Sequence, residues 1–233
     1  MWLVVLTGCM GTLRSAEGPD EIRGALWFAG REGALNGTSI GSGDDTPVEA
    51  LTLLANSTLP CRADDVADDP ETGIDEAAAA KSYWQAQVAA AFTREGAILV
   101  LLGAYTWSDS LTGDYAVSAS ALENHLDDLA TEPRVGFGAW MRVNEAKVDD
   151  STGLFYSYTD TDVDFDPGAG SSSTLSLDVL GQPATLADAE TMTGQFDLQP
   201  SGMSGHFRAE RCDNDALYTA LVAQEVAFQY LVN

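Results

Sequence analysis

The sequence predicts a mainly β fold, an antiparallel β-sandwich with about three peripheral α-helices. Apolar and polar residues alternate with a period of two over residues 135–143, as in a half-buried strand. The pattern small-Gly-polar-Phe occurs at 193–196 and again at 204–207, which predicts a hairpin. About seven to nine short strands without a repeating strand–helix–strand order favour a sandwich over a parallel sheet.

Apolar runs bounded by turn residues predict the remaining strands. They lie at 24–30, 49–58, 96–107, around residue 117, and at 154–165 and 174–180. In the hairpin, Pro200-Ser201-Gly202 supplies the turn. The alternation then predicts one core-facing row on each hairpin strand: Met192, Gly194, Phe196 and Leu198 on the first, and Met203, Gly205, Phe207 and Ala209 on the second.

Three segments have the apolar spacing of helices. The first, over 74–92, follows a capping-box pattern and places Trp84, Val88 and Phe92 on one face. The second begins at Ser120 and ends near residue 129, because Pro133 prevents its continuation. The third is predicted at the C-terminal end, over about residues 214–231.

The N-terminal stretch carries a targeting motif. The apolar run Trp2-Leu3-Val4-Val5 precedes Leu6-Thr7-Gly8-Cys9, which resembles the lipobox of bacterial lipoproteins. The resemblance implies a diacylglyceryl group on the Cys9 thiol, cleavage before Cys9 and acylation of the new amino group. Several acyl chains anchor a protein stably. Because the run is short and no Lys or Arg precedes it, we expect the true start upstream of Met1.

The lipobox predicts three parts of the chain. Residues 1–8 are the remnant of a signal peptide, 9–21 are the lipidated cysteine and a polar tether, and 22–233 are a single β-rich extracytoplasmic domain. We expect a cell-envelope protein held to a membrane by lipid, the outer membrane where the cell has one. A strand near Cys61, a Gly-x-Tyr turn and a hairpin ending at Cys212 loosely resemble uncharacterised β-sandwich lipoprotein domains of environmental bacteria, which implies no activity.

The other two cysteines form an even pair. With Cys9 assigned to the lipobox, Cys61 and Cys212 remain in a chain that is expected to be exported. Such compartments favour disulfides, so we predict a Cys61–Cys212 bridge. A metal site is the alternative, but neither cysteine has another Cys or a His nearby in the sequence.

The chain is strongly acidic, with 36 Asp and Glu against 11 Lys and Arg and a net charge of −25. This charge argues against nucleic acid and against direct adhesion to anionic lipid, because both need clustered cations. A solvated acidic surface, a saline habitat and divalent-cation binding all remain open as reasons for it.

One acidic array is a candidate calcium site, made of Asp160, Asp162, Asp164 and Asp166. On a strand, alternate carboxylates stand about 6.6–6.8 Å apart. Calcium takes six to eight oxygens at about 2.3–2.6 Å, so the row needs a bend near residue 167 to chelate an ion. The alternative is a solvated face whose charges block edge pairing.

No catalytic set is visible. His125 and His206 are the two histidines, and neither a Gly-x-Ser-x-Gly elbow nor a His-Glu-x-x-His motif occurs. We therefore predict no enzyme and no cofactor apart from the calcium alternative. The leading expectation is a structural or binding module with an unknown protein or polysaccharide partner. The alternatives are a calcium-dependent adhesion or envelope module and, less favoured, a carboxylate-based hydrolase.

Overall fold

The computed structural model describes residues 10–16, 18–31, 47–59, 61, 96–108, 110–117, 127–145, 162–166, 172–179, 190–200 and 202–212. They contain eleven strands in one continuous sheet. In chain order these are β1 (Gly11–Ser15), β2 (Gly18–Glu21), β3 (Gly24–Arg31), β4 (Val48–Ala55), β5 (Ile98–Thr106), β6 (Gly113–Val117), β7 (Arg134–Glu145), β8 (Asp162–Asp166), β9 (Thr174–Val179), β10 (Thr191–Leu198) and β11 (Met203–Arg211).

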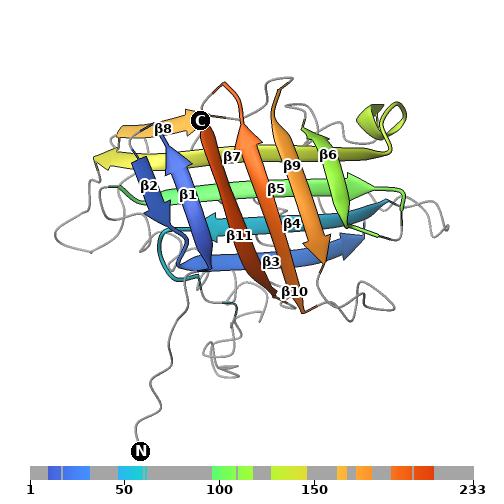
Figure 1. Ribbon diagram of the computed structural model, residues 1–233, viewed down its shortest axis with the longest axis horizontal. Coiled ribbons are helices and arrows are strands. Elements are labelled where there is room, and N and C mark those ends of the chain that lie inside the picture. Colours follow the sequence, from blue (N-terminus) through green and yellow to red (C-terminus); the bar gives the residue numbers. More distant parts are fainter. Residues whose placement is uncertain are drawn as a thin grey trace, which may run out of the picture.

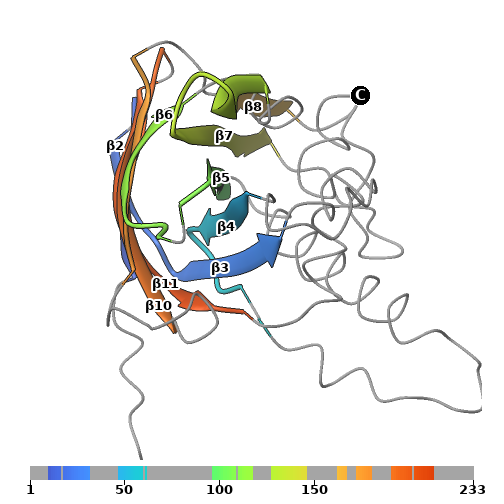
Figure 2. The ribbon, with the colours of Figure 1, turned by 90° about the vertical axis from the view of Figure 1, so that its right-hand side faces the viewer.

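Eight of the strands close into a barrel in the order β3-β4-β5-β7-β6-β9-β10-β11, and β11 returns to β3. In Figure 1, β3, β4, β5 and β7 run across the molecule, while β1, β11, β10 and β9 cross them steeply. Figure 2 shows the second set from the side as a curved wall. The predicted antiparallel β-sandwich with about three helices is therefore wrong.

The barrel differs from a sandwich because two seams join its walls. At one seam β6 runs parallel to β7, with Ala116 opposite Val135 and the next residues paired in turn. At the other, β11 runs parallel to β3, with Glu210 opposite Leu26 and Arg211 opposite Trp27. Each seam has two residue pairs. At each seam the same strand edge is shared with another neighbour. β7 pairs with β8 as well as with β6, and β11 pairs with β1 as well as with β3.

The predicted helices lie almost entirely outside the described residues. The segments 74–92 and 214–231 are not described, and of the predicted helix over 120–129 only residues 127–129 are. Those residues are helical, and within the described part of the chain they are the only helical positions. What the structure describes is thus nearly all strand.

Residues 10–16 and 18–21, predicted as part of a tether, instead contain β1 and β2, two strands that extend the sheet beside the barrel. β1 pairs with β11, and β2 pairs with β1. Leu13 and Ile22 are buried in the core, which secures both ends of the hairpin. The Gly, Pro and polar content of this segment suggested a flexible linker, but β2 is an edge strand, where Pro19 is tolerated.

The predicted C-terminal hairpin is confirmed as β10 and β11. Gly194 pairs with Phe207, and Phe196 pairs with Gly205, so each phenyl ring lies beside a glycine. The two ring centroids are 6.5 Å apart. A Cβ added at Gly194 would lie 2.5 Å from Cζ of Phe207, so the ring fills the space that a side chain would need. The predicted core-facing rows of the hairpin do face the barrel core, where Met192, Phe196, Leu198, Met203, Phe207 and Ala209 are buried.

The interior is packed with side chains from all eight barrel strands. The central strands β4 and β5 are buried on both faces over nearly their whole length. Their continuous apolar sequences are typical of strands with two buried faces. Trp27, with no exposed surface, is the largest fully buried side chain.

Asn56 joins the β2 hairpin to the barrel. Its Nδ2 donates to Oδ2 of Asp20 (3.0 Å) and to the Gly96 carbonyl (2.8 Å), and its Oδ1 accepts from the Ile98 amide (3.0 Å). We expect Asn56→Ala to lower the free energy of unfolding by about 2–3 kcal/mol, because buried backbone groups lose their partners. Urea denaturation measures this change. The control Gln199→Ala, which removes an exposed amide, should change it by less than about 0.5 kcal/mol.

Candidate functional site

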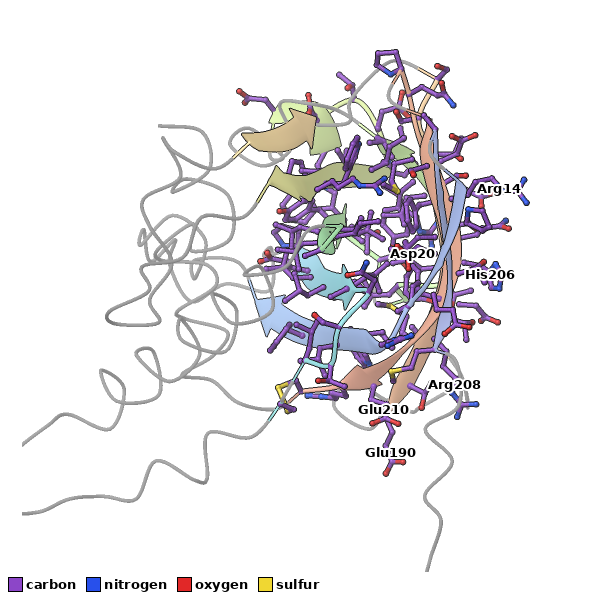
Figure 3. The ribbon with its side chains drawn as sticks, turned by 90° about the vertical axis from the view of Figure 1, so that its left-hand side faces the viewer. Arg14, Asp20, Glu190, His206, Arg208 and Glu210 are labelled. Atoms are coloured by element: carbon purple, nitrogen blue, oxygen red, sulfur yellow. A yellow bond between two sulfur atoms is a disulfide. The ribbon has the colours of Figure 1, made fainter. Side chains whose placement is uncertain are left out.

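A groove of about 660 Å³ crosses the outer face of β9, β10 and β11 and reaches the residues at the start of β1. Its surface is largely apolar, and polar side chains stand along it. Figure 3 shows His206 and Arg208 pointing away from the barrel on this face, with Arg14 from β1 beside them. The outward side chains in the groove come from alternate positions of three neighbouring strands: Ser176, Asp178, Thr193, Gln195, His206 and Arg208.

The strand register explains why this surface is hollow. Thr193 lies opposite Asp178 on one side and opposite Arg208 on the other. The short threonine therefore stands between two longer, oppositely charged side chains, whose strands are roughly 9–10 Å apart. The Thr193 hydroxyl donates to the Asp178 carbonyl (3.3 Å). Within the described residues, neither the Asp178 carboxylate nor the Arg208 guanidinium has a hydrogen-bond or ion-pair partner.

A second row of polar side chains lies beside the first. Ser176, Gln195, His206 and Thr12 are paired in sequence across β9, β10, β11 and β1. The Nδ1 atom of His206 is 3.1 Å from the Thr12 hydroxyl, which orients the imidazole. The groove therefore presents a carboxylate, a guanidinium, an oriented imidazole and an amide. This set binds polar ligands by hydrogen bonds and charge.

Cys61 and Cys212 lie at disulfide distance, with 5.5 Å between their Cα atoms, which agrees with the predicted pairing. Cys212 follows β11 directly, and its amide donates to the Trp27 carbonyl (2.9 Å). The Arg211 guanidinium lies 5.5 Å from the centroid of the Trp27 ring. These contacts gather at the β3–β11 seam, so the disulfide secures one of the two short links that close the barrel.

The other seam is supported by Tyr115. Its hydroxyl donates to the Leu111 carbonyl (2.6 Å). Burial raises the pKa of Tyr115 well above the usual tyrosine range, against the smaller lowering effect of the Arg134 charge and hydrogen bond. The neutral phenol is therefore the form that the fold retains.

This pKa shift predicts a loss of stability at alkaline pH. Below about pH 10, the usual tyrosine pKa, Tyr115 is protonated in both states. Above it, the unfolded chain releases the proton and the folded chain keeps it, so the free energy of unfolding falls as pH rises. Urea denaturation between pH 9 and 11 measures the slope. Tyr115→Phe should reduce that slope, and an unchanged slope would contradict the assignment.

The remaining predicted site residues are only partly described. Cys9, Asp160 and His125 lie outside the described residues. Asp162, Asp164 and Asp166 lie at alternate positions of β8, and the register places Asp164 opposite Arg142. Among the described residues, no group of three or more His, Cys, Asp or Glu side chains is placed to hold a metal ion.

The sequence reading did not find the groove. Of the polar side chains that line it, the sequence points only to His206, as one of the two histidines, and not to Asp178, Thr193, Gln195 or Arg208. The available signal was the polar half of the alternation in 174–180, 191–198 and 203–211. Alternation identifies outward residues, but the register between strands decides which of them become neighbours.

The fold and the groove define the class of this protein as a closed eight-strand β-barrel with a groove on its outer surface. No family model, curated protein or solved structure matches the chain. In the described part of the structure, no helix combines the length and the apolar content that crossing a bilayer requires.

Proposed function

We propose that this chain is a lipid-anchored cell-envelope protein whose barrel serves as a binding module. The distribution of the three cysteines carries the proposal. Cys61 and Cys212 are paired at disulfide distance, and Cys9 remains in the lipobox-like sequence Leu6-Thr7-Gly8-Cys9. Disulfides persist mainly in exported proteins, which are also the substrates of lipobox processing.

The outer groove supports the binding part of the proposal. Its charged side chains are exposed, its imidazole is oriented by Thr12, and it lies on rigid paired strands rather than on a loop. Sites on such elements hold their side chains in place without a ligand.

Metabolic labelling with a palmitate analogue in a bacterial host tests the anchor. The chain from Leu6 onward, fused behind the leader of a bacterial lipoprotein, should incorporate the label, and Cys9→Ser should abolish incorporation. The matched control, Cys61→Ser with Cys212→Ser, should keep the label because it leaves Cys9 intact. Label that persists after Cys9→Ser would show that the lipid, if any, is attached elsewhere.

A further inference from the structure

Met10, the residue that follows Cys9, is fixed to the sheet by backbone hydrogen bonds. The Met10 amide donates to the Ile22 carbonyl (3.2 Å), and the Met10 carbonyl accepts from the Arg208 amide (2.7 Å). Consecutive Cα atoms are about 3.8 Å apart, so Cys9 is held within one residue of these bonds. Met10 also lines the outer groove. A lipid on Cys9 would therefore be attached one residue from the groove, which makes this face the part of the barrel nearest to the bilayer.

We infer that the outer face of β1, β11, β10 and β9 lies against the bilayer, and that the groove holds the headgroup of a zwitterionic phospholipid. The inference rests on the proposed lipidation of Cys9. The position of Met10 determines which face meets the membrane, and the charges in the groove determine which headgroup it accepts.

The groove charges match a zwitterion. Arg208 and Asp178 stand on either side of Thr193, with roughly 9–10 Å between their strands. A lipid phosphate binds the guanidinium by paired charge-assisted hydrogen bonds, and the ammonium group of the same headgroup meets the carboxylate. Gln195 and His206 in the adjacent row supply donors for the remaining oxygens.

The rest of the chain favours contact at headgroup depth with neutral lipid. The net charge of −25 repels anionic lipid, whereas a zwitterionic headgroup adds no net charge. Among the described residues the exposed large apolar side chain is Trp107, which follows β5 and does not line the groove. The groove thus combines a largely apolar floor with the charged side chains of Asp178 and Arg208.

Spin labelling of the acylated full chain on phosphatidylethanolamine–phosphatidylcholine vesicles tests the orientation. A nitroxide on Gln195→Cys should lose at least about threefold of its collision rate with a water-soluble nickel complex when the protein binds vesicles. A nitroxide on the exposed control Glu132→Cys should keep its rate. If the collision rate falls by the same factor at both sites on vesicle binding, in protein shown by palmitate labelling to be acylated, the inference is overturned and the proposed anchor is retained. Absence of acylation would instead refute the proposed function.

Titration of the non-acylated Cys9→Ser chain with glycerophosphoethanolamine tests the headgroup site. Saturable NMR shifts are expected at the amides of 176–178, 193–195 and 206–208. Arg208→Gln should weaken binding at least about tenfold, and the control Arg14→Gln, on the same face outside the groove lining, should bind as the parent does. Equal shifts with inorganic phosphate alone, or saturable shifts only with a neutral oligosaccharide, would overturn the headgroup assignment.

Discussion

Removing the disulfide by Cys61→Ala with Cys212→Ala should lower the free energy of unfolding by about 4–5 kcal/mol. The bridge joins residues 151 apart in sequence, and the chain-entropy model gives this magnitude for a closed loop of that length. The bridge also lies at the β3–β11 seam, which has two backbone pairs. Urea denaturation of the oxidised parent and the double variant measures the loss.

Hydrogen exchange locates the effect. The amide of residue 212, which donates to the Trp27 carbonyl, should exchange faster in the variant than amides in the middle of β5. Cys9→Ser is the matched control because it removes a thiol and leaves the bridge intact. A loss below about 1 kcal/mol in the double variant would mean that the seam holds without the bridge.

Trp27→Ala should lower the free energy of unfolding by about 3–5 kcal/mol, the usual cost of removing a fully buried large aromatic side chain. Trp27 has no exposed surface, and its ring also lies beneath the Arg211 guanidinium. The substitution removes core packing and a cation–π contact from the same seam. Thermal and urea denaturation measure the change.

Two comparisons sharpen this prediction. Trp107→Ala, at a tryptophan that is 47% exposed, should cost less than about 1 kcal/mol. Trp27→Phe should cost clearly less than Trp27→Ala, because in the described structure the buried indole nitrogen has no hydrogen-bond acceptor to lose. Combining Trp27→Ala with loss of the disulfide should be non-additive, since both act on one seam. Full additivity would show that they act independently.

Local patterns predicted the strands well. The apolar runs at 24–30 and 96–107 became β3 and β5, and the glycine–phenylalanine repeat became the β10–β11 hairpin with its expected inward row. Period-two alternation is a property of one strand and its two faces, so one sequence suffices to see it. The prediction failed where neighbours are distant in the chain.

The barrel itself depends on such distant neighbours. Its parallel seams pair Ala116 with Val135 and Glu210 with Leu26, and two residue pairs leave no periodic signature. For the same reason the sequence predicts too late a start for the domain, because β1 joins the sheet through its pairing with the distant strand β11. The groove could not be predicted either, because Asp178, Thr193 and Arg208 become neighbours only through the register of three strands.

The pairing of β1 with β11 also sets an order for folding. Thr12 and His206 are partners although they lie 194 positions apart in the sequence, whereas β10 and β11 meet through a short turn. Distant contacts close late because the entropy of the intervening loop must be overcome first. Of the described strands, β1 is synthesised first and its partner β11 last, so this pairing forms late. Until β11 arrives, β1, β3 and β10 each have an open edge, and open edges are where nascent β-proteins associate with one another.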